Sequence, residues 1–541
     1  MNKKKLNKKT KILIVTGGVF SSLGKGVACS SLGAMLKCFK MNVLIMKFDP
    51  YLNVDAGTMA PGQHGEVFVT SDGHETDLDI GNYERFLNVN LPKDSNVTAG
   101  KIYYETLQKE RDGKFLGATV QVVPHITDAI SEKVISLSNK YEPDFLIVEV
   151  GGTVGDIESI PFLESLRQLQ AEYRSQIMFI HTVPLIELLT SNDVKTKPLQ
   201  HSVKELMSFG IFPNLLLVRS KDELTDKLKL KINLTTGIEQ KNIYSLINLK
   251  HIYLIPESLE SQNIQNSIFT FFKMETPERV GYKTWDTFVS LIKKPKKYKA
   301  KIAIVGKYLD ASDTYLSIIS GLEISAFYLN TDITMEFIDS STIDEKNVCE
   351  LKEYDGILVP GGFGIRGIEG KILAIKYARE NNIPYFGICL GMQLACIEFA
   401  RNVLNIKDAD STEFNENTKN PVITILEGKD KDHNLGGTLR LGNFSCHLKP
   451  NTKIHSIYKK DDILERHRHR YEFNSKYTDL FEKNGFVFSG VNLDKNLVEI
   501  IEIKDHKFFI ACQFHAEFSS KILSPNPIFY SFVNAARKVN S

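Results

Sequence analysis

A cysteine between two glycines stands in the second half of the chain, in the segment Gly387-Ile388-Cys389-Leu390-Gly391. This spacing is typical of a sharp strand-to-helix turn that projects a nucleophile. Cys389 would lie at a helix N-terminus, where the helix dipole favours the thiolate. The backbone N–H of Leu390 would help to form an oxyanion hole, and the loop Pro360-Gly361-Gly362-Phe363-Gly364 could give a second donor. The sequence therefore predicts a thiol nucleophile.

A histidine that could serve this thiol lies near the end of the chain, in His515-Ala516-Glu517. His515 is the candidate general base, and Glu517 would orient it if both residues pointed to the same side of a strand. The alternative is a buried structural cysteine beside a satisfied histidine. The remaining cysteines lack such a context and are expected to be packing residues: Cys29, Cys38, Cys349, Cys396, Cys446 and Cys512.

A glycine-rich loop near the start of the chain, Ser21-Ser22-Leu23-Gly24-Lys25-Gly26, could hold phosphate groups. Between a strand and a helix, such a loop exposes backbone N–H groups to a phosphate, and Lys25 would reach the phosphate oxygens. Gly26 replaces the Ser or Thr of a standard Walker A loop, whose hydroxyl normally holds magnesium. An ordinary glycine-rich turn of an α/β domain is the alternative.

Carboxylates elsewhere in the chain would then have to bind the metal. The candidates are Asp79, in an acidic segment, and Glu149, at the carboxyl end of an apolar run. Magnesium prefers a few carboxylates together with water and phosphate oxygens. Burying Glu149 without a partner would be costly, whereas a solvated acidic loop is the alternative for Asp79.

Three polar segments leave more than one interpretation open. Residues 155–158 offer carboxylates and residues 195–200 offer lysines, which would suit a second nucleotide or a plain polar surface. The run Arg466-His467-Arg468-His469-Arg470 is short and flanked by glutamates, which favours a carboxylate-binding or interface role over a nucleic-acid patch.

Short apolar runs predict the elements that would position these residues. We expect a helix from Lys25 to Lys40, and strands at 12–15, 43–46, 145–150, 178–181, 215–218, 252–255, 301–306, 356–359 and 384–388. The order strand, glycine loop, helix, strand begins a doubly wound α/β domain. The sequence predicts two such domains: a disordered basic tail over 1–11, a first domain over 12–273, a basic linker over 274–300 and a second domain over 301–541.

The composition is that of an ordinary soluble protein with more than one domain. The chain has 541 residues, more than one core usually supports. Its 67 basic and 65 acidic residues give no reason to expect a nucleic-acid or membrane partner. The seven cysteines are scattered without a C-x-x-C pair, which fits a reducing cytoplasm and argues against a disulfide framework or zinc ribbon.

Together these residues closely resemble the CTP synthase family, the glutamine-dependent amidotransferases that convert UTP to CTP. The resemblance covers essentially the whole chain after the tail. Its most specific strings are T-G-G-V-F-S-S-L-G-K-G, H-G-E-V-F-V-T, E-T-D-L-D, G-G-T-V-G-D-I-E-S, K-T-K-P-L-Q-H-S-V-K-E-L, P-G-G-F-G-I-R-G, G-I-C-L-G-M-Q and R-H-R-H-R-Y-E. The cysteine half alone would indicate only a class I glutamine amidotransferase domain. The resemblance of the P-loop-type synthetase half points to one reaction, the conversion of UTP to CTP.

The resemblance implies a mechanism with two sites. ATP would phosphorylate the uracil 4-oxygen of UTP. Cys389 would form a glutamyl thioester with L-glutamine and release ammonia, with His515 moving the proton. Ammonia would pass through the protein and displace the phosphate. The family is also inhibited by CTP, activated by GTP and homo-oligomeric, from dimer to tetramer.

The resemblance also assigns residues. ATP would contact Ser21, Ser22, Leu23, Gly24, Lys25, Gly26 and Asp79, with Mg²⁺ on Asp79 and Glu149. UTP or CTP would contact Ser21, Asp156, Ile157, Glu158, Lys195, Thr196, Lys197, Pro198, Leu199, Gln200 and Lys231. Glutamine would contact Gly362, Leu390, Gly391, Met392, Gln393, Glu413 and Arg470. Residues 436–442 resemble the family's mobile lid near the GTP site.

Two departures from the family stand out. The usual H-P-E reads His515-Ala516-Glu517 here, which loses the fixed φ of proline but keeps both functional side chains. The segment 427–434 before the lid is short, which bears on GTP activation. The alternatives to a working CTP synthase are another ATP-dependent amidase of this architecture and a filament-forming scaffold without turnover.

Overall fold

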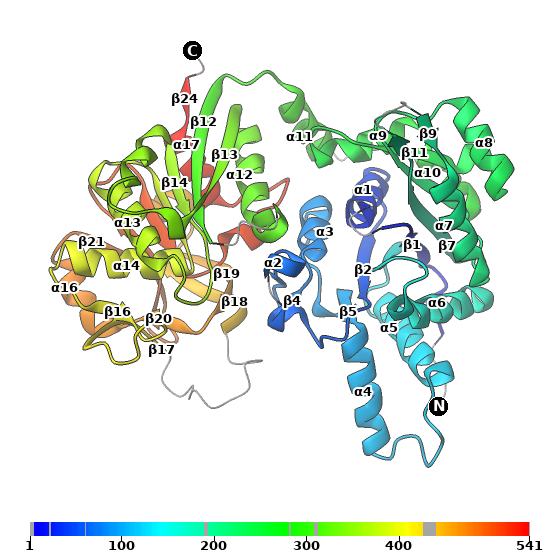
Figure 1. The fold of residues 1–541 in the computed structure, drawn as a ribbon, viewed down its shortest axis with the longest axis horizontal. Helices are drawn as coiled ribbons and strands as arrows, with labels where there is room; N and C mark the ends of the chain where they lie inside the picture. Colours follow the sequence, from blue (N-terminus) through cyan, green and yellow to red (C-terminus); the bar gives the residue numbers. More distant parts are fainter. Residues whose placement is uncertain are drawn as a thin grey trace. The chain divides into compact units, whose positions relative to one another are not determined.

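The computed structural model describes residues 5–20, 23–59, 61–188, 193–280, 283–307, 312–425 and 440–539. Its internal contacts divide the chain into two compact units, each of the α/β class that the sequence predicts (Figure 1). The first unit consists of Met1–Ala56 and Asp79–Val289, and the second of Gly57–Leu78 and Ser290–Ser541. A piece of the N-terminal half of the sequence therefore belongs to the second unit.

The first unit is built on a seven-stranded parallel sheet. In spatial order its strands are β11 (Ile243–Ile247), β10 (Leu215–Ser220), β7 (Ile177–Pro184), β1 (Lys11–Gly17), β6 (Phe145–Val150), β2 (Val43–Asp49) and β5 (Asn96–Thr98). The central strands are apolar and buried, as expected for a parallel sheet that helices cover on both faces. Because the strands are parallel, the loops that follow β7, β1, β6 and β2 lie at one edge of the sheet.

Helices connect these strands. They are α1 (Lys25–Cys38), α3 (Asp79–Leu87), α4 (Ala99–Arg111), α5 (Thr127–Tyr141), α6 (Ile160–Glu172), α7 (Lys197–Ser208), α8 (Asp226–Thr236), α9 (Ile255–Ser261) and α10 (Ile264–Phe271). Local signals set their ends. The hydroxyl of Thr225 accepts a hydrogen bond from Leu228 N at the start of α8, and Gly237 ends that helix in the left-handed region.

Three predicted segments differ in the structure. The strand predicted over 252–255 is wrong, because Ile252–Leu254 form a 3₁₀ turn and Pro256 lies in the first turn of α9. The tail predicted over 1–11 is too long, because Leu6 is buried in the core of the first unit and β1 begins at Lys11.

The predicted linker over 274–300 also carries regular structure. Helix α11 (Lys283–Lys293) lies within it, and β12 begins at Tyr298. The apolar residues of α11 recur at helical spacing, and Trp285 and Phe288 are buried. The basic run around Pro295 therefore connects a packed helix to a strand.

The second unit is built on a ten-stranded mixed sheet. Its strands are, in order, β13 (Thr331–Asp339), β12 (Tyr298–Gly306), β14 (Gly356–Val359), β15 (Tyr385–Ile388), β23 (Phe509–Cys512), β22 (Leu497–Ile503), β21 (Phe486–Asn492), β18 (Arg440–Leu448) and β19 (Asp462–His469), with β24 (Lys538–Val539) beside β12. The strands from β13 to β23 are parallel to one another, and the others pair antiparallel.

Smaller elements complete both units. In the second unit the helices are α2 (Pro61–His64), α12 (Leu316–Tyr328), α13 (Ile368–Glu380), α14 (Leu390–Asn402), α15 (Lys453–Tyr458), α16 (Thr478–Glu482) and α17 (Pro527–Ala536). The short strands are β3 (Phe68–Val69) with β4 (Glu75–Thr76), and β16 (Ala409–Ser411) with β17 (Asn420–Ile425) and β20 (Tyr471–Phe473). In the first unit β8 (Ile186–Leu188) pairs with β9 (Asp193–Lys195).

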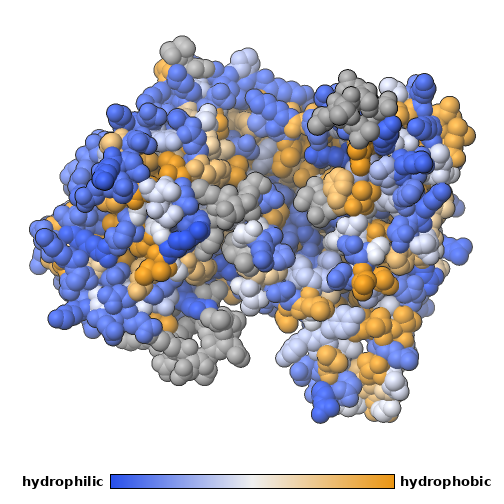
Figure 2. Space-filling view, in the orientation of Figure 1, coloured by the Kyte–Doolittle hydropathy of each residue, from blue (hydrophilic) through white to orange (hydrophobic). Residues whose placement is uncertain are grey.

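Exposed apolar side chains interrupt the hydrophilic surface over α4 and the segment that follows it (Figure 2). They are Tyr104, Leu107, Leu116, Val122 and Val123. Clustered exposed apolar residues of this kind mark surfaces that bind a partner.

Two arginines on one face of β19 hold the segment 57–78 to the rest of the second unit. Arg466 donates to Val69 O at 3.0 Å, and its guanidinium lies over the ring of Phe68. Arg468 donates to the Glu75 carboxylate at 2.7 Å. His467, which lies between these arginines, points to the opposite face of the strand. Arg468 thus pairs with a carboxylate of its own unit, and the carboxylate-binding or interface role predicted for this run stays a prediction.

We expect Arg466→Leu to loosen this segment, because Val69 O and the Phe68 ring lose their cationic partner. The change should cost about 1–3 kcal/mol locally. Hydrogen exchange of the backbone amides of residues 66–76 should accelerate. Arg401→Leu is the matched control, since Arg401 contacts Ala409 O and Glu369 instead; equal protection of the segment in both variants would contradict the anchoring role.

Candidate active sites

The turn that carries Cys389 is strained and tightly packed. Cys389 has φ 52° and ψ −102°, in a region that costs non-glycine residues about 1–3 kcal/mol. Its backbone N–H donates to Cys512 O at 2.7 Å, which ties the turn to the neighbouring strand β23. A side chain at Gly391 would lie 2.2 Å from Val359 O, so glycine is required there. This geometry is that of the nucleophile elbow expected from the sequence.

His515 and Glu517 form the partner pair of the cysteine. Nδ1 of His515 lies 2.7 Å from Oε1 of Glu517, and the imidazole stacks on the ring of Phe518 at 4.9 Å. The sequence predicts that both side chains point to the same side of one strand. The structure differs, because β23 ends at Cys512 and Ala516–Ser519 form a 3₁₀ turn. The turn nevertheless brings the carboxylate onto the ring nitrogen.

The electrostatics of this pair favour an imidazolium. Burial lowers the pKa of His515, but the charges of Glu517 and Cys389 outweigh it and raise the pKa to about 10. Nε2 of His515 is buried, and hydrogen bonding to Cys389 also contributes to the raised pKa. At neutral pH the ring therefore holds a proton on the side away from Glu517, where it can deliver it to a leaving group.

A small cavity of about 80 Å³ opens onto the thiol. Cys389, His515 and Glu517 line it, together with the glycine loop after β14. A side chain at Gly361 would come within 3.1 Å of the imidazole, so glycine lets the loop approach the ring without displacing it. Glu66 and Val67 from segment 57–78 form part of the wall.

The residues predicted to bind glutamine fall into two groups. Gly362 lines the cavity, Glu413 accepts from Gly364 N at 2.9 Å, and the charge of Arg470 acts on Glu413. The side chains of Leu390 and Met392 are instead buried in the hydrophobic core, and that of Gln393 donates to Tyr471 O at 2.9 Å. These residues, like Gly391, could contact glutamine only through their backbone.

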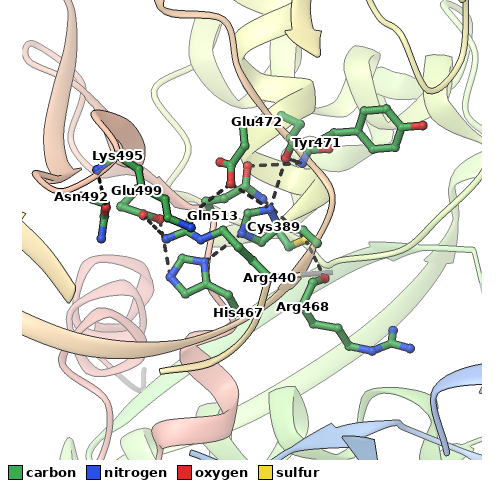
Figure 3. A network of polar contacts seen from close by, with 12 residues as sticks. Cys389, Arg440, His467, Arg468, Tyr471, Glu472, Asn492, Lys495, Glu499 and Gln513 are labelled. Carbon is green, nitrogen blue, oxygen red and sulfur yellow. Dashed lines mark hydrogen bonds and ion pairs between the residues drawn. The ribbon is translucent and has the colours of Figure 1, made fainter. Parts of the chain in front are cut away.

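A buried charged cluster lies behind the thiol site (Figure 3). Arg440 donates to Glu472 at 2.9 Å and to Glu499 at 2.6 Å, joining β18, β20 and β22. Burial raises the pKa of Glu472 to about 8 and that of Glu499 to about 7, although Arg440 opposes both shifts. Of the predicted lid over 436–442, residues 436–439 lie outside the described residues, as does the short segment 427–434.

In the first unit, the glycine loop lies at the edge where the parallel strands end. Gly24 has φ 94°, and Lys25 begins α1 with its ammonium donating to Gly152 O at 2.5 Å. Burial lowers the pKa of Lys25. Leu23 is buried, and the predicted phosphate ligands Ser21 and Ser22 lie outside the described residues.

Asp79 and Glu149 come together beside this lysine. Asp79 begins α3 and pairs with Lys47, while Glu149 on β6 accepts from the hydroxyl of Tyr83. Burial first, then the charge of Asp79, raises the pKa of Glu149 to about 7. A divalent cation would relieve this repulsion, so the two carboxylates fit a magnesium ion that takes its other ligands from water and phosphate. Among the described residues, no group of three or more His, Cys, Asp or Glu could hold a metal.

Gly26 explains how this site differs from a standard Walker A loop. A side chain at Gly26 would lie 2.0 Å from Oδ1 of Asp79. The missing hydroxyl is thus replaced by a carboxylate that occupies the space beside the glycine.

The residues predicted to bind UTP or CTP lie in separate elements: residues 156–158 follow β6, residues 195–200 span the end of β9 and the start of α7, and Lys231 lies within α8. Asp156, Ile157, Glu158, Lys195, Lys197 and Lys231 are exposed, and Pro198 and Gln200 are half-buried. Thr196 precedes α7 and accepts from the Gln200 amide. Leu199 is buried in a core cluster, so its side chain cannot contact a ligand.

The sequence did not single out several residues that the structure places at these sites. Lys47 contacts Asp79 and Tyr83 contacts Glu149, the two carboxylates predicted to bind a metal, and Gln513 contacts Cys389. Lys47, like Glu149, is a charged residue within an apolar strand. Because burying a charge is costly without a partner, this pattern could have indicated Lys47 as a site residue. Cys349 was expected to be a packing residue but is exposed.

Nearly the whole chain is similar to known proteins. The profile of the CTP synthase N-terminus matches residues 11–274, and that of class-I glutamine amidotransferases matches residues 311–535. A CTP synthase of Hydrogenobaculum sp. (strain Y04AAS1) is 51% identical over 97% of this chain and 98% of its own length. A CTP synthase of Staphylococcus saprophyticus is 50% identical over the same shares.

A solved structure is also similar to part of the chain. The glutaminase domain of Trypanosoma brucei CTPS with bound acivicin shares 39% identity, with a TM-score of 0.42, over 44% of this chain and 93% of its own length.

We expect Gly26→Ser to displace Asp79, because the new side chain would overlap its carboxylate. ATP-dependent turnover with ammonium as the nitrogen source should fall at least ~10-fold, an effect of at least about 1.4 kcal/mol on the barrier. Initial rates at varied ATP measure this. Gly62→Ala is the control, since a side chain there meets no atom within 4 Å. A Gly26→Ser variant as active as this control would refute the steric argument.

The pH dependence of glutamine hydrolysis should report the protonation of His515. The proton is present below the raised pKa of about 10 and lost above it, so glutamate release should decline as pH rises through this value. Glu517→Gln removes the largest favourable charge and should move the decline to lower pH. The measurement is glutamate release between pH 7 and 11; an unmoved decline in this variant would contradict the assignment.

Proposed function

The chain belongs to the CTP synthase family, and from this premise we propose how its two units share the reaction. The protein is a glutamine-hydrolysing CTP synthase, which uses ATP and glutamine to aminate UTP. The observation that supports the division of labour best is the hydrogen-bonded pair of His515 and Glu517 beside a cysteine on a nucleophile elbow.

The second unit would release the ammonia. The sulfur of Cys389 forms a bond to the amide carbon of glutamine, and the carbon–nitrogen bond breaks. His515 delivers its proton to the departing nitrogen, so that ammonia leaves and a glutamyl thioester remains. Water then cleaves the thioester to glutamate. Backbone N–H groups of Leu390 and the loop after β14 would stabilise the oxyanion, and Glu413 and Arg470 would bind the α-amino and α-carboxylate groups.

The first unit would activate UTP. The glycine loop and Lys25 would bind the phosphates of ATP, and Asp79 and Glu149 would hold Mg²⁺, which neutralises phosphate charge when bound. Residues 156–158, 195–200 and Lys231 would bind UTP, or CTP as inhibitor. Transfer of phosphate to the uracil 4-oxygen would create a leaving group that ammonia displaces. Internal transfer of ammonia stays a prediction.

Regulation and assembly complete the proposal. GTP would activate and CTP would inhibit, and the chain would form a homo-oligomer, from dimer to tetramer. Family membership supports each of these, and the exposed apolar residues over α4 support assembly. No helix among the described residues is long and apolar enough to cross a membrane.

Absorbance near the CTP band tests this proposal, with ATP, Mg²⁺, UTP and GTP and either glutamine or ammonium chloride. We expect CTP from both nitrogen sources. Cys389→Ser should lose at least ~1000-fold of the glutamine-dependent rate and keep the ammonium-dependent rate. Loss of both rates in folded Cys389→Ser, or retention of both, would contradict the division between the units.

A further inference from the structure

We propose that Gln513 is a further catalytic residue, whose side-chain amide donates a hydrogen bond to the sulfur of Cys389 and stabilises the thiolate. Gln513 follows β23 directly and is fully buried. Its Nε2 lies 3.7 Å from Sγ of Cys389, within hydrogen-bond distance for sulfur. Figure 3 shows the amide beside the cysteine. This role rests on the proposed function of Cys389 as the nucleophile.

The hydrogen-bond network fixes which end of the amide faces the sulfur. Tyr471 O is a backbone carbonyl and can only accept, so the group of Gln393 that lies 2.9 Å from it must be the NH₂. The second hydrogen of this NH₂ points to Gln513 at 3.2 Å, which must therefore present its oxygen. The NH₂ of Gln513 is then left to face Cys389.

The amide is suited to the charged form of the nucleophile. The protonated thiol can donate to Arg468 O, 3.9 Å away, but this carbonyl offers nothing to a thiolate. The side-chain NH₂ of Gln513 can donate to the sulfur whether it is a thiol or a thiolate, and hydrogen bonds to charged acceptors are the stronger ones. A donor to the charged form favours that form. Gln513 and His515 would thus share the stabilisation of the thiolate.

The amide is held on rigid elements that also hold the cysteine. The backbone N–H of Gln513 donates to the backbone carbonyl of Glu499 at 2.8 Å. The side chain of Glu499 is in turn held by Arg440 in the buried cluster. Gln393 lies in the first turn of α14, and its N–H donates to Cys389 O at 3.2 Å. Gln393 is therefore a positioning residue, because it orients Gln513 without touching the sulfur.

The test is alkylation of Cys389 by iodoacetamide as a function of pH, which needs neither glutamine nor turnover. Peptide mass spectrometry separates Cys389 from the exposed Cys349. Gln513→Met keeps the side-chain volume and removes both hydrogen bonds. Gln513→Glu keeps an oxygen that accepts from Gln393 and replaces the NH₂ that donates to Cys389 with a second carboxylate oxygen. The matched control is Asn492→Leu, since Asn492 is a buried amide of the same unit that donates to Ser445.

We expect Gln513→Met to slow alkylation at pH 7 about 10-fold, the effect of about 1.4 kcal/mol, and to move the midpoint of the pH profile upward. Gln513→Glu should move it further, because it adds a negative charge. Circular dichroism checks that each variant is folded. A wild-type profile in either folded variant, or the same shift in Asn492→Leu, would overturn the proposal.

The result is distinguishable from a failure of the proposed function. If Cys389→Ser kept glutamine-dependent synthesis, the nucleophile itself would be misassigned. If that variant lost it while Gln513→Met alkylated like the wild type, only the role of Gln513 would fall.

Discussion

The parallel pairing of β15 with β23 is the constraint on which the thiol site depends. Ile388 lies opposite Cys512, so the residues that follow both strands emerge at the same edge of the sheet. Cys389 comes from one strand, and Gln513, His515 and Glu517 come from the other. A shift of one residue would turn the side chains of a strand to the other face. The same pairing supplies the acceptor that sustains the strained backbone of Cys389.

The first unit obeys a related constraint, in which buried charges must balance. Lys25, Asp79 and Glu149 come from three different segments, and Lys47 joins them from β2. A buried charge whose partner is removed is strongly destabilising, so none of the four residues is independent of the others. The arrangement also raises the pKa of Glu149 to about 7, so its charge changes near neutral pH. This would suit the proposed role of the site, in which a cation enters and leaves with a nucleotide.

Local signals let the sequence anticipate much of this, and long-range packing limited the rest. Apolar runs that end in glycine identified β1, β6, β14 and β15, and the glycine pattern identified the elbow at Cys389. The apolar run 252–255 misled because Pro256 starts a helix there. No local pattern could show that Gln393 and Gln513 meet, since the two lie 120 residues apart and the glycine motif that ends at Gln393 does not reveal its distant partner. The alternation of arginine and histidine in β19 was visible, but its two faces could be assigned only once segment 57–78 was placed.

Segment 57–78 makes the second unit depend on residues encoded in the first part of the gene. Its partners on β19 and the ring of Phe518 are encoded about 400 codons downstream. A gene fusion that joined the N-terminal half of one relative to the C-terminal half of another would bring together a segment and a binding surface with separate histories. The two halves of such a gene are therefore poor candidates for exchange as independent modules, and substitutions on either side of this contact are expected to be inherited in matched pairs.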